Sequence, residues 1–239
     1  MYVDIHAHLD LCQNLEEVLV LAKKAQVTHI ISAGINKQTS LQTLELSKQH
    51  SSVHASIGVY PEFTETTEWI AQYSKECIAI GECGLDFHIT QDEQEKQRQE
   101  RLFVEQILLA KRFEKPLIVH SRKAELRVLE VLEQHNAKHV ILHCFEGSTQ
   151  LITRAIANKY YLTATSNIAR SDSVKHKVAL TPLHLLFTET DAPYMARIKG
   201  GMSQPADVMH TIEVIANLKK ITHEECARLI FMNYKKMFG

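Results

Sequence analysis

The chain has 239 residues, of which 45% are hydrophobic and 23% are charged, and its formal net charge is -1. This size and composition fit one globular domain over residues 1–239, and the near-zero charge excludes a strong overall field that would attract polyanions, so any contact with nucleic acid must rest on a local basic cluster. Five cysteines without CxxC spacing indicate neither a disulfide framework nor a structural zinc motif. With no signal peptide and no long apolar run, the sequence predicts a cytoplasmic protein without a membrane span.

Short runs rich in Val, Ile and Leu alternate along the chain with longer segments of helical pattern. This alternation predicts βαβ units and a parallel sheet. We expect eight strands, at residues 2–6, 29–33, 53–59, 78–82, 117–120, 140–143, 160–164 and 185–188.

Several helices carry recognisable boundary signals. Three segments place a capping residue three positions before a glutamate, which is typical of a helix start: Asn14 before Glu17, Thr90 before Glu93, and Thr222 before Glu225. Residues 93–113 carry an apolar stripe and many charges elsewhere, as an outer-layer helix does. Pro116 ends that pattern, and Pro205 suits the first position of a later helix.

Eight strand-then-helix units predict an α/β protein, a single-domain (β/α)8 TIM barrel whose strand ends and following loops build a site at one face. A doubly wound open sheet is the alternative, but the chain lacks the Gly-rich turn after the first strand that a dinucleotide site needs. The barrel is also favoured because closing the sheet would bring polar residues at several strand ends around one axis.

Those polar residues are histidines and carboxylates. His6 and His8 close the first strand, and their spacing puts both imidazoles on one side of an extended segment. Each of the others follows an apolar run: Glu82, His120, His143 and Asp191. Histidine and carboxylate ligands without thiolates suit a divalent ion such as Zn, Mn, Co, Ni or Fe, with Mg as a further option.

Six ligands exceed what one catalytic ion usually takes, which favours two divalent ions. Glu82 is the natural bridge, with His6, His8 and Asp191 around one ion and with His120 and His143 around the other. Such a pair activates water for hydrolysis, and Asp191 is the candidate that accepts the proton of the water and passes it to the leaving group.

The motifs that carry these residues resemble those of the TatD family of metal-dependent deoxyribonucleases, within the amidohydrolase-like barrels. They are His6-Ala-His8-Leu-Asp10, Ile80-Gly-Glu82-Cys-Gly-Leu-Asp86, the segment from Pro116 to His120-Ser-Arg122, His143-Cys-Phe-Glu-Gly147, and Glu189-Thr-Asp191-Ala-Pro193-Tyr. The resemblance spans nearly the whole chain. It implies a (β/α)8 barrel, a pair of Zn, Mn or Mg ions held by the six residues, and hydrolysis of phosphodiester bonds in DNA, often as a 3'-to-5' exonuclease, with single-stranded DNA as the expected substrate.

Two segments depart from the family pattern. Where members commonly have Gly-x-His-Pro-His, this chain reads Gly58-Val-Tyr60-Pro61-Glu62, and residues 161–167 are not of the usual Ser-x-Ser-Gly type. Neither change alters a proposed ligand, so both bear on substrate choice more than on metal binding.

Other residues have paired interpretations. Arg122 is placed either to hold a phosphate oxygen, which makes it a catalytic candidate with Asp191 and Glu82, or to form a salt bridge. Glu189 either orients a ligand or the water, or is structural. Asp10, Asp86 and His88 are candidates for groups that orient the ligand imidazoles by hydrogen bonds. Strand alternation predicts that Cys83 and Cys144 turn away from the metal side.

Two further functions stay open at this point. One is a metal-dependent hydrolase of a small amide, an ester or aminoacylated RNA, which the neutral charge and the changed 58–62 segment favour. The other is a metal-stabilised scaffold without turnover, which the complete ligand set argues against.

Overall fold

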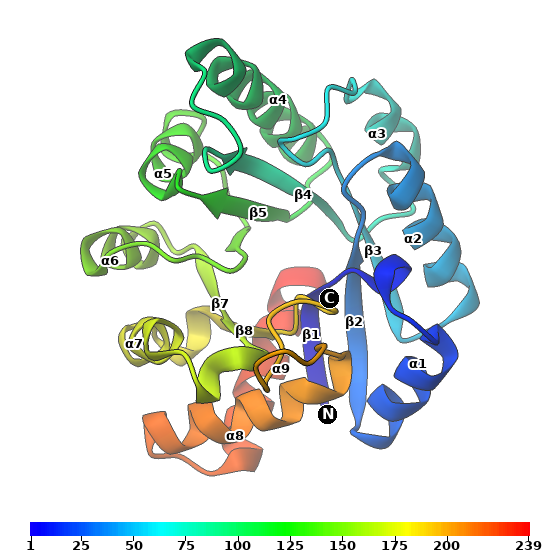
Figure 1. Ribbon diagram of the computed structural model, residues 1–239, viewed down its shortest axis with the longest axis vertical. Coiled ribbons are helices and arrows are strands. Elements are labelled where there is room, and N and C mark those ends of the chain that lie inside the picture. The colour runs from blue at the N-terminus through cyan, green and yellow to red at the C-terminus, as the bar shows by residue number, and fades with distance from the viewer.

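A computed structural model describes residues 1–239 and consists of eight parallel strands and nine α-helices (Figure 1). The strands are β1 (Tyr2–Ala7), β2 (Val27–Ala33), β3 (Val53–Ile57), β4 (Ala79–Asp86), β5 (Leu117–Arg122), β6 (Val140–Leu142), β7 (Tyr161–Thr165) and β8 (Leu186–Glu189). The helices are α1 (Leu15–Lys24), α2 (Lys37–Gln49), α3 (Glu68–Tyr73), α4 (Glu93–Arg112), α5 (Glu125–Gln134), α6 (Thr149–Ala157), α7 (Asp172–Leu180), α8 (Val208–Lys219) and α9 (His223–Phe238).

The strands pair in chain order, each parallel to the next, from β1 to β8. The ends of the sheet meet beside the carboxyl end of β1. There the Asp191 N–H donates to the His6 carbonyl (2.9 Å) and the His8 N–H donates to the Ala192 carbonyl (2.8 Å). This confirms the predicted (β/α)8 barrel. It also places the backbones of three candidate ligands at the seam.

A buried carboxylate reinforces the same seam. Asp4 is fully buried on β1, and its carboxylate accepts hydrogen bonds from the backbone N–H and the hydroxyl of Thr190. The Thr188 hydroxyl donates to the Val3 carbonyl at 2.6 Å. Burial raises the pKa of Asp4 well above its usual value. Asp4 was not among the predicted residues, although it has the same strand parity as His6 and therefore faces the same way.

Strand β4 runs four residues beyond the predicted end at Glu82. Its later residues pair with β5, with Gly84 opposite His120 and Asp86 opposite Arg122. Gly81 and Gly84 have positive φ, and a Cβ at either position would collide with a carbonyl oxygen of β5. Glycine therefore permits this close approach. Glu82 consequently lies in the middle of a strand and not at its end.

The other boundary differences have local causes. Strand β3 ends at Ile57, before the predicted residue 59, because the Val59 N–H donates to the side chain of Gln106 on α4 at 2.8 Å. Thr222 caps α9 as predicted, by accepting from the Glu225 N–H. Asn14 holds the N-cap position of α1 as predicted, but its backbone is left-handed and its side chain makes no capping bond.

Helix α4 begins at Glu93, but its cap is Asp92, whose side chain accepts from the Gln94 N–H. The predicted cap Thr90 instead accepts from the Asp92 N–H. Pro205 opens a short 3-10 helix (Pro205–Asp207) that leads into α8, as its ring geometry favours.

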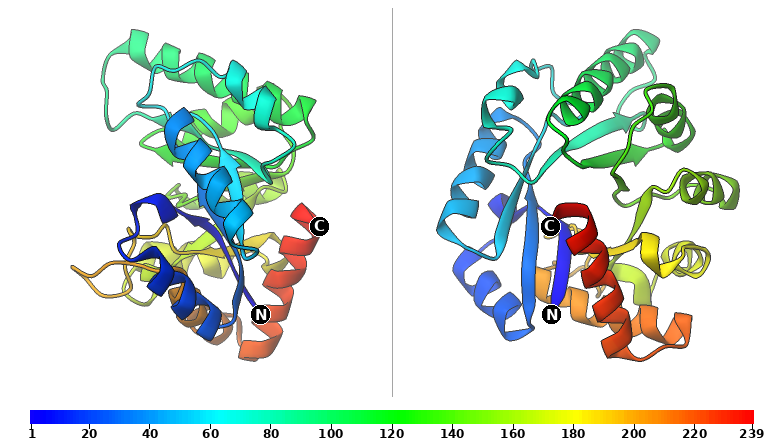
Figure 2. Two further views of the ribbon diagram at one scale, coloured as in Figure 1. Left: turned by 90° about the vertical axis from the view of Figure 1, so that its right-hand side faces the viewer. Right: turned by 180° about the vertical axis from the view of Figure 1, so that it is seen from behind.

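Helices α1 to α8 surround the sheet, whereas α9 lies at the opposite end of the barrel from the loop that follows β8 (Figure 2). Side chains from several strands and from α9 form one buried cluster, which includes Ile31, Ile118, Ile141, Phe187, Ile230 and Tyr234. One end of the barrel is thus filled by apolar packing, and the polar side chains gather at the other. None of the helices combines the length and the apolar composition of a membrane span.

Candidate metal centre

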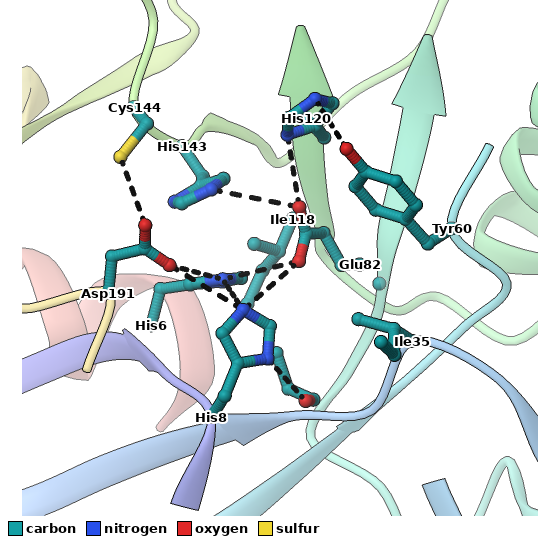
Figure 3. A network of polar contacts seen from close by, with 12 residues as sticks. His6, His8, Ile35, Tyr60, Glu82, Ile118, His120, His143, Cys144 and Asp191 are labelled. Atoms are coloured by element: carbon teal, nitrogen blue, oxygen red, sulfur yellow. Dashed lines mark hydrogen bonds and ion pairs between the residues drawn. The ribbon is translucent and has the colours of Figure 1, made fainter. Parts of the chain in front are cut away.

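A pocket of about 830 Å³ opens at the carboxyl ends of the strands. Five of the six predicted ligands line it, and the sixth, His6, is fully buried beneath them. The side chains come from β1 and the residue that follows it, from β4, from β5, from the residue after β6 and from the loop after β8, and they point toward one another (Figure 3). The structure therefore brings together all six residues that the sequence singled out.

Four of these side chains converge on one point. The Nε2 atoms of His6 and His8 are 3.3 Å apart. Each of these nitrogens is 3.4 Å from Glu82 Oε2, and they lie 3.6 and 3.5 Å from Asp191 Oδ1. Ligand atoms about 2.0–2.2 Å from a shared ion in a tetrahedral arrangement are roughly 3.3–3.6 Å apart. The ligand atoms of His6, His8 and Asp191 lie close enough together to hold one divalent ion, and Glu82 Oε2 lies at the same distance from both imidazoles.

The other oxygen of Glu82 faces two different imidazoles. Glu82 Oε1 is 3.1 Å from His120 Nδ1 and 3.7 Å from His143 Nε2. One carboxylate thus presents one oxygen to each of two groups of nitrogens. This is the arrangement expected of a carboxylate that bridges two ions.

The partners of the remaining ring nitrogens set the tautomers. His8 Nδ1 is 3.1 Å from the Ala33 carbonyl, and His143 Nδ1 is 3.1 Å from Glu189 Oε2. His120 Nε2 is 3.3 Å from Asp86 Oδ2. Because an oxygen acceptor requires the hydrogen on the nitrogen that faces it, the opposite nitrogen carries a lone pair. When these three histidines are neutral, that lone pair faces Glu82 in each, so acceptors face acceptors, and a cation between them would satisfy both.

The electrostatics favour an ionised Glu82. Burial by itself would raise the pKa of Glu82, but the imidazoles of His120 and His6 beside its oxygens outweigh burial and hold the pKa well below its usual value. The carboxylate therefore stays charged across the neutral range, as a metal ligand must.

Glu189 supports His143 from beneath the centre. Its side chain also accepts from the Thr163 hydroxyl (2.6 Å) and from the Cys144 N–H (3.0 Å). Burial by itself would raise the pKa of Glu189, but the charge and hydrogen bond of His143 outweigh burial, and the pKa falls to about 2. Of the two interpretations of Glu189, the contacts favour the orienting one. Thr163 was not predicted, and its only sequence signal is its inward parity on β7.

Tyr60, in the segment that departs from the family pattern, contacts a predicted ligand, so this departure lies beside the candidate metal centre as well as in the pocket. Its hydroxyl donates to Asp86 Oδ2 (2.6 Å) and lies 3.1 Å from His120 Nε2. Burial raises the pKa of Asp86, but hydrogen bonds from His120 and Tyr60 lower it to about 2. Tyr60 lies 26 residues from Asp86 and 60 from His120, and no local pattern links such positions.

The remaining candidates separate into three kinds. Arg122 is exposed, lines the pocket and forms no ion pair, which argues against the salt-bridge interpretation. His88 lines the pocket, and its backbone N–H, not its imidazole, donates to Asp86 Oδ1, so its contribution to the centre is through the main chain. One carboxylate oxygen of Asp10 is buried without a hydrogen bond, and no ligand imidazole contacts it.

Cys83 is buried in the core as predicted, but the prediction for Cys144 is wrong. Its Sγ atom lies 3.9 Å from Asp191 Oδ2, and the residue lines the pocket (Figure 3). Strand β6 ends at Leu142, and Cys144 has a left-handed backbone (φ 45°), so strand alternation no longer applies. Burial raises the pKa of the Cys144 thiol, which keeps it a thiol and disfavours a thiolate ligand.

Known proteins resemble this chain over its whole length. Residues 3–239 match the family described as TatD related DNase. The "Uncharacterized metal-dependent hydrolase YabD" of Bacillus subtilis is 34% identical, over 100% of this chain and 99% of its own. The "3'-5' ssDNA/RNA exonuclease TatD" of Escherichia coli is 29% identical, over 94% and 92%. A solved structure, the TatD homologue YJJV of Escherichia coli, superposes with a TM-score of 0.90 at 27% identity and covers 99% of this chain and 97% of its own.

Proposed function

Since this chain belongs to the family of TatD-related DNases, we propose that it hydrolyses phosphodiester bonds in single-stranded DNA, as a 3'-to-5' exonuclease, with two divalent ions. A relative named for 3'-5' exonuclease activity on single-stranded DNA and RNA supports the substrate and the polarity. The convergence of ring nitrogens from His6, His8, His120 and His143 on the two oxygens of Glu82 carries the proposal.

The residues divide between two positions. His6, His8 and Asp191 would hold one ion, His120 and His143 would hold the other, and Glu82 would offer one oxygen to each. Zn, Mn and Mg are the candidates that histidine and carboxylate donors suit. When bound, the ions make water more acidic and neutralise charge that develops on the phosphoryl oxygens.

Asp191 is the proposed acid and base. Its Oδ1 faces the imidazoles of His6 and His8, and its side chain is about 10% exposed at the floor of the pocket. It is thus held where it reaches both the centre and the substrate. Asp191 accepts a proton from the attacking water and passes it to the leaving oxygen of the cleaved bond.

Cations beside the centre bind the substrate. Arg122 and Lys123 line the pocket at the end of β5, and Arg122 has no carboxylate partner. Its planar guanidinium can hold a phosphate oxygen by two parallel hydrogen bonds. Because the net charge of the chain is only -1, attraction of a polyanion depends on such local cations.

The test is nucleotide release from the 3' end of a labelled single-stranded DNA oligonucleotide. We expect activity with Mn²⁺, Mg²⁺ or Zn²⁺, its loss on addition of chelator, and its return when metal is restored. Asp191→Asn should lower kcat by about 10²–10⁴, the usual contribution of a general acid or base. Asp172→Asn is the matched control, because that side chain is 98% exposed on α7. Activity that persists in chelator, or in Asp191→Asn, would contradict the proposal.

One observation supports a second candidate function. Tyr60 and Glu62 line the pocket in the segment that departs from the family pattern, and a carboxylate at this mouth opposes binding of a long polyanion. A panel of amides, esters and aminoacylated RNA, assayed with the same metal-loaded preparation, separates the two candidates. Turnover of one panel member far above that of DNA would favour the alternative. A scaffold without turnover would show no chelator-sensitive activity on any substrate.

A further inference from the structure

The side chains of Tyr60, Asp86 and His120 form a closed triangle at the edge of the candidate centre. The Tyr60 hydroxyl is 2.6 Å from Asp86 Oδ2 and 3.1 Å from His120 Nε2, and His120 Nε2 is 3.3 Å from the same Asp86 oxygen. The rings of Tyr60 and His120 are 4.8 Å apart (Figure 3). Each member therefore contacts both others.

The hydroxyl hydrogen of Tyr60 and the Nε2 hydrogen of His120 both form hydrogen bonds within this triangle. Tyr60 donates its single hydroxyl hydrogen to Asp86, and the ring hydrogen of His120 Nε2 points at Asp86 Oδ2 and the phenolic oxygen. The hydroxyl consequently has no hydrogen left to donate to a substrate, even though Tyr60 lines the pocket. A direct role in binding phosphate is thus disfavoured.

Asp86 is itself rigidly held. It is fully buried, its Oδ1 accepts from the His88 N–H at 2.9 Å, and its own N–H donates to the side chain of Gln99 at 2.9 Å. His120, in contrast, has no side-chain partner at Nε2 other than Asp86 and Tyr60. The orientation of its Nδ1 toward Glu82 therefore depends on these two groups.

We propose that Tyr60 is a positioning residue for the second ion: with Asp86 it holds the His120 ring so that Nδ1 faces Glu82, and it does not bind the substrate. The inference rests on the proposed two-ion centre and assigns a role to the position at which this chain departs from the family pattern. Groups that orient a metal-ligating histidine typically change metal affinity by about 10- to 100-fold when removed.

The experiment is a titration of the metal-free protein with Mn²⁺, in which binding is measured by calorimetry and by electron paramagnetic resonance. Tyr60→Phe keeps the ring and removes the hydroxyl. We expect the step assigned to the ion at His120 and His143 to weaken by about 10- to 100-fold, with the other step unchanged. At low Mn²⁺, kcat should fall and return to the wild-type value at high Mn²⁺, with KM for DNA unchanged. Tyr73→Phe is the control, because the Tyr73 hydroxyl on α3 makes no hydrogen bond.

A second variant tests whether Tyr60 acts through Asp86. Asp86→Asn should weaken the same binding step, and the double variant should lose less affinity than the two single losses added together, because groups in one network are not independent. Purely additive losses would overturn the inference.

The remaining outcomes are also decisive. Two normal binding steps in Tyr60→Phe, with a raised KM for DNA, would overturn the inference and identify Tyr60 as a substrate contact. A single Mn²⁺ site in the wild-type protein would overturn the two-ion centre, and this inference with it. Absence of nuclease activity would sink only the proposed function, because the titration needs no substrate.

Discussion

At the scale of single residues, the second nitrogen of each histidine decides what the first can bind. Glu189 has the most demanding position, because its two oxygens accept from His143 Nδ1, the Thr163 hydroxyl and the Cys144 N–H. A carboxylate can accept hydrogen bonds at both of its terminal atoms, whereas a side-chain amide can accept at only one. Its value to the centre therefore lies in its acceptor capacity as well as its charge.

Glu189→Gln tests this role. The amide places its NH₂ group against a donor in either orientation, so His143 loses its fixed tautomer or Thr163 loses its acceptor. We expect the metal affinity of the pure protein, measured by elemental analysis after dialysis against buffered metal, to fall by about 10- to 100-fold. Glu17→Gln on the exposed face of α1 is the control. Metal content equal to that of the wild type would show that Glu189 is merely structural.

At the scale of elements, a cluster of aromatic rings joins β2, β3 and α9. His29 Nδ1 is 2.8 Å from His54 Nε2, and the His29 ring stacks on Tyr234 of α9 at 4.4 Å. Burial, with a smaller effect of His29, lowers the pKa of His54 to about 4. Burial also lowers the pKa of His29, as does the charge of Lys235. The packing of α9 here requires neutral imidazoles.

This cluster should make stability depend on pH. Above about pH 6.5, the pKa of histidine in an unfolded chain, His54 is neutral in both states and its packing contributes fully. As pH falls below 6.5 the unfolded chain takes up the proton first, so the free energy of unfolding decreases until the pH passes the folded pKa of about 4.

Thermal unfolding of the metal-free protein between pH 7.5 and pH 4.5 is the measurement. His54→Gln should flatten the fall in Tm relative to the wild type, whereas His184→Gln, at an exposed position, should leave it unchanged. A wild-type slope in His54→Gln would contradict the assignment. The metal must be absent, because protonation of the ligand histidines also weakens metal binding.

At the scale of the whole molecule, the proposed ligands come from opposite ends of the chain, from His6 on β1 to Asp191 after β8. The hydrogen bonds that close the barrel involve the backbones of these same residues. Ions bound there would tie the first strand to the last. Metal binding should consequently stabilise the entire fold.

Thermal unfolding with and without metal measures this linkage. At about 100 times the dissociation constant, one site adds roughly 2.7 kcal/mol, which corresponds to a rise in Tm of about 5–10 °C for a domain of this size. Asp191→Asn should show a smaller rise, and NaCl at matched ionic strength should show none. A metal-independent Tm in the wild type would argue against a built metal centre.

Local sequence patterns were enough to predict the barrel and the six candidate ligands of this protein. Period-two and helical periodicities are properties of neighbouring residues, so the alternation of strands and helices predicted the barrel. The period of two along an extended strand predicted that the side chains of His6 and His8 lie on the same face. Motifs following apolar runs marked the other candidate ligands, because parallel strands end at one edge of a sheet.

Tertiary structure alone decided the rest. Tyr60 meets Asp86 and His120, Glu82 lies within β4 and not at its end, and Cys144 turns toward Asp191. The contacts of Tyr60 join residues that are 26 and 60 positions apart. The direction of Cys144 depends on a left-handed backbone just after β6. Chain periodicity encodes which way a side chain faces, but the neighbour it meets is set by barrel closure and by the close approach of β4 to β5, which no single segment specifies.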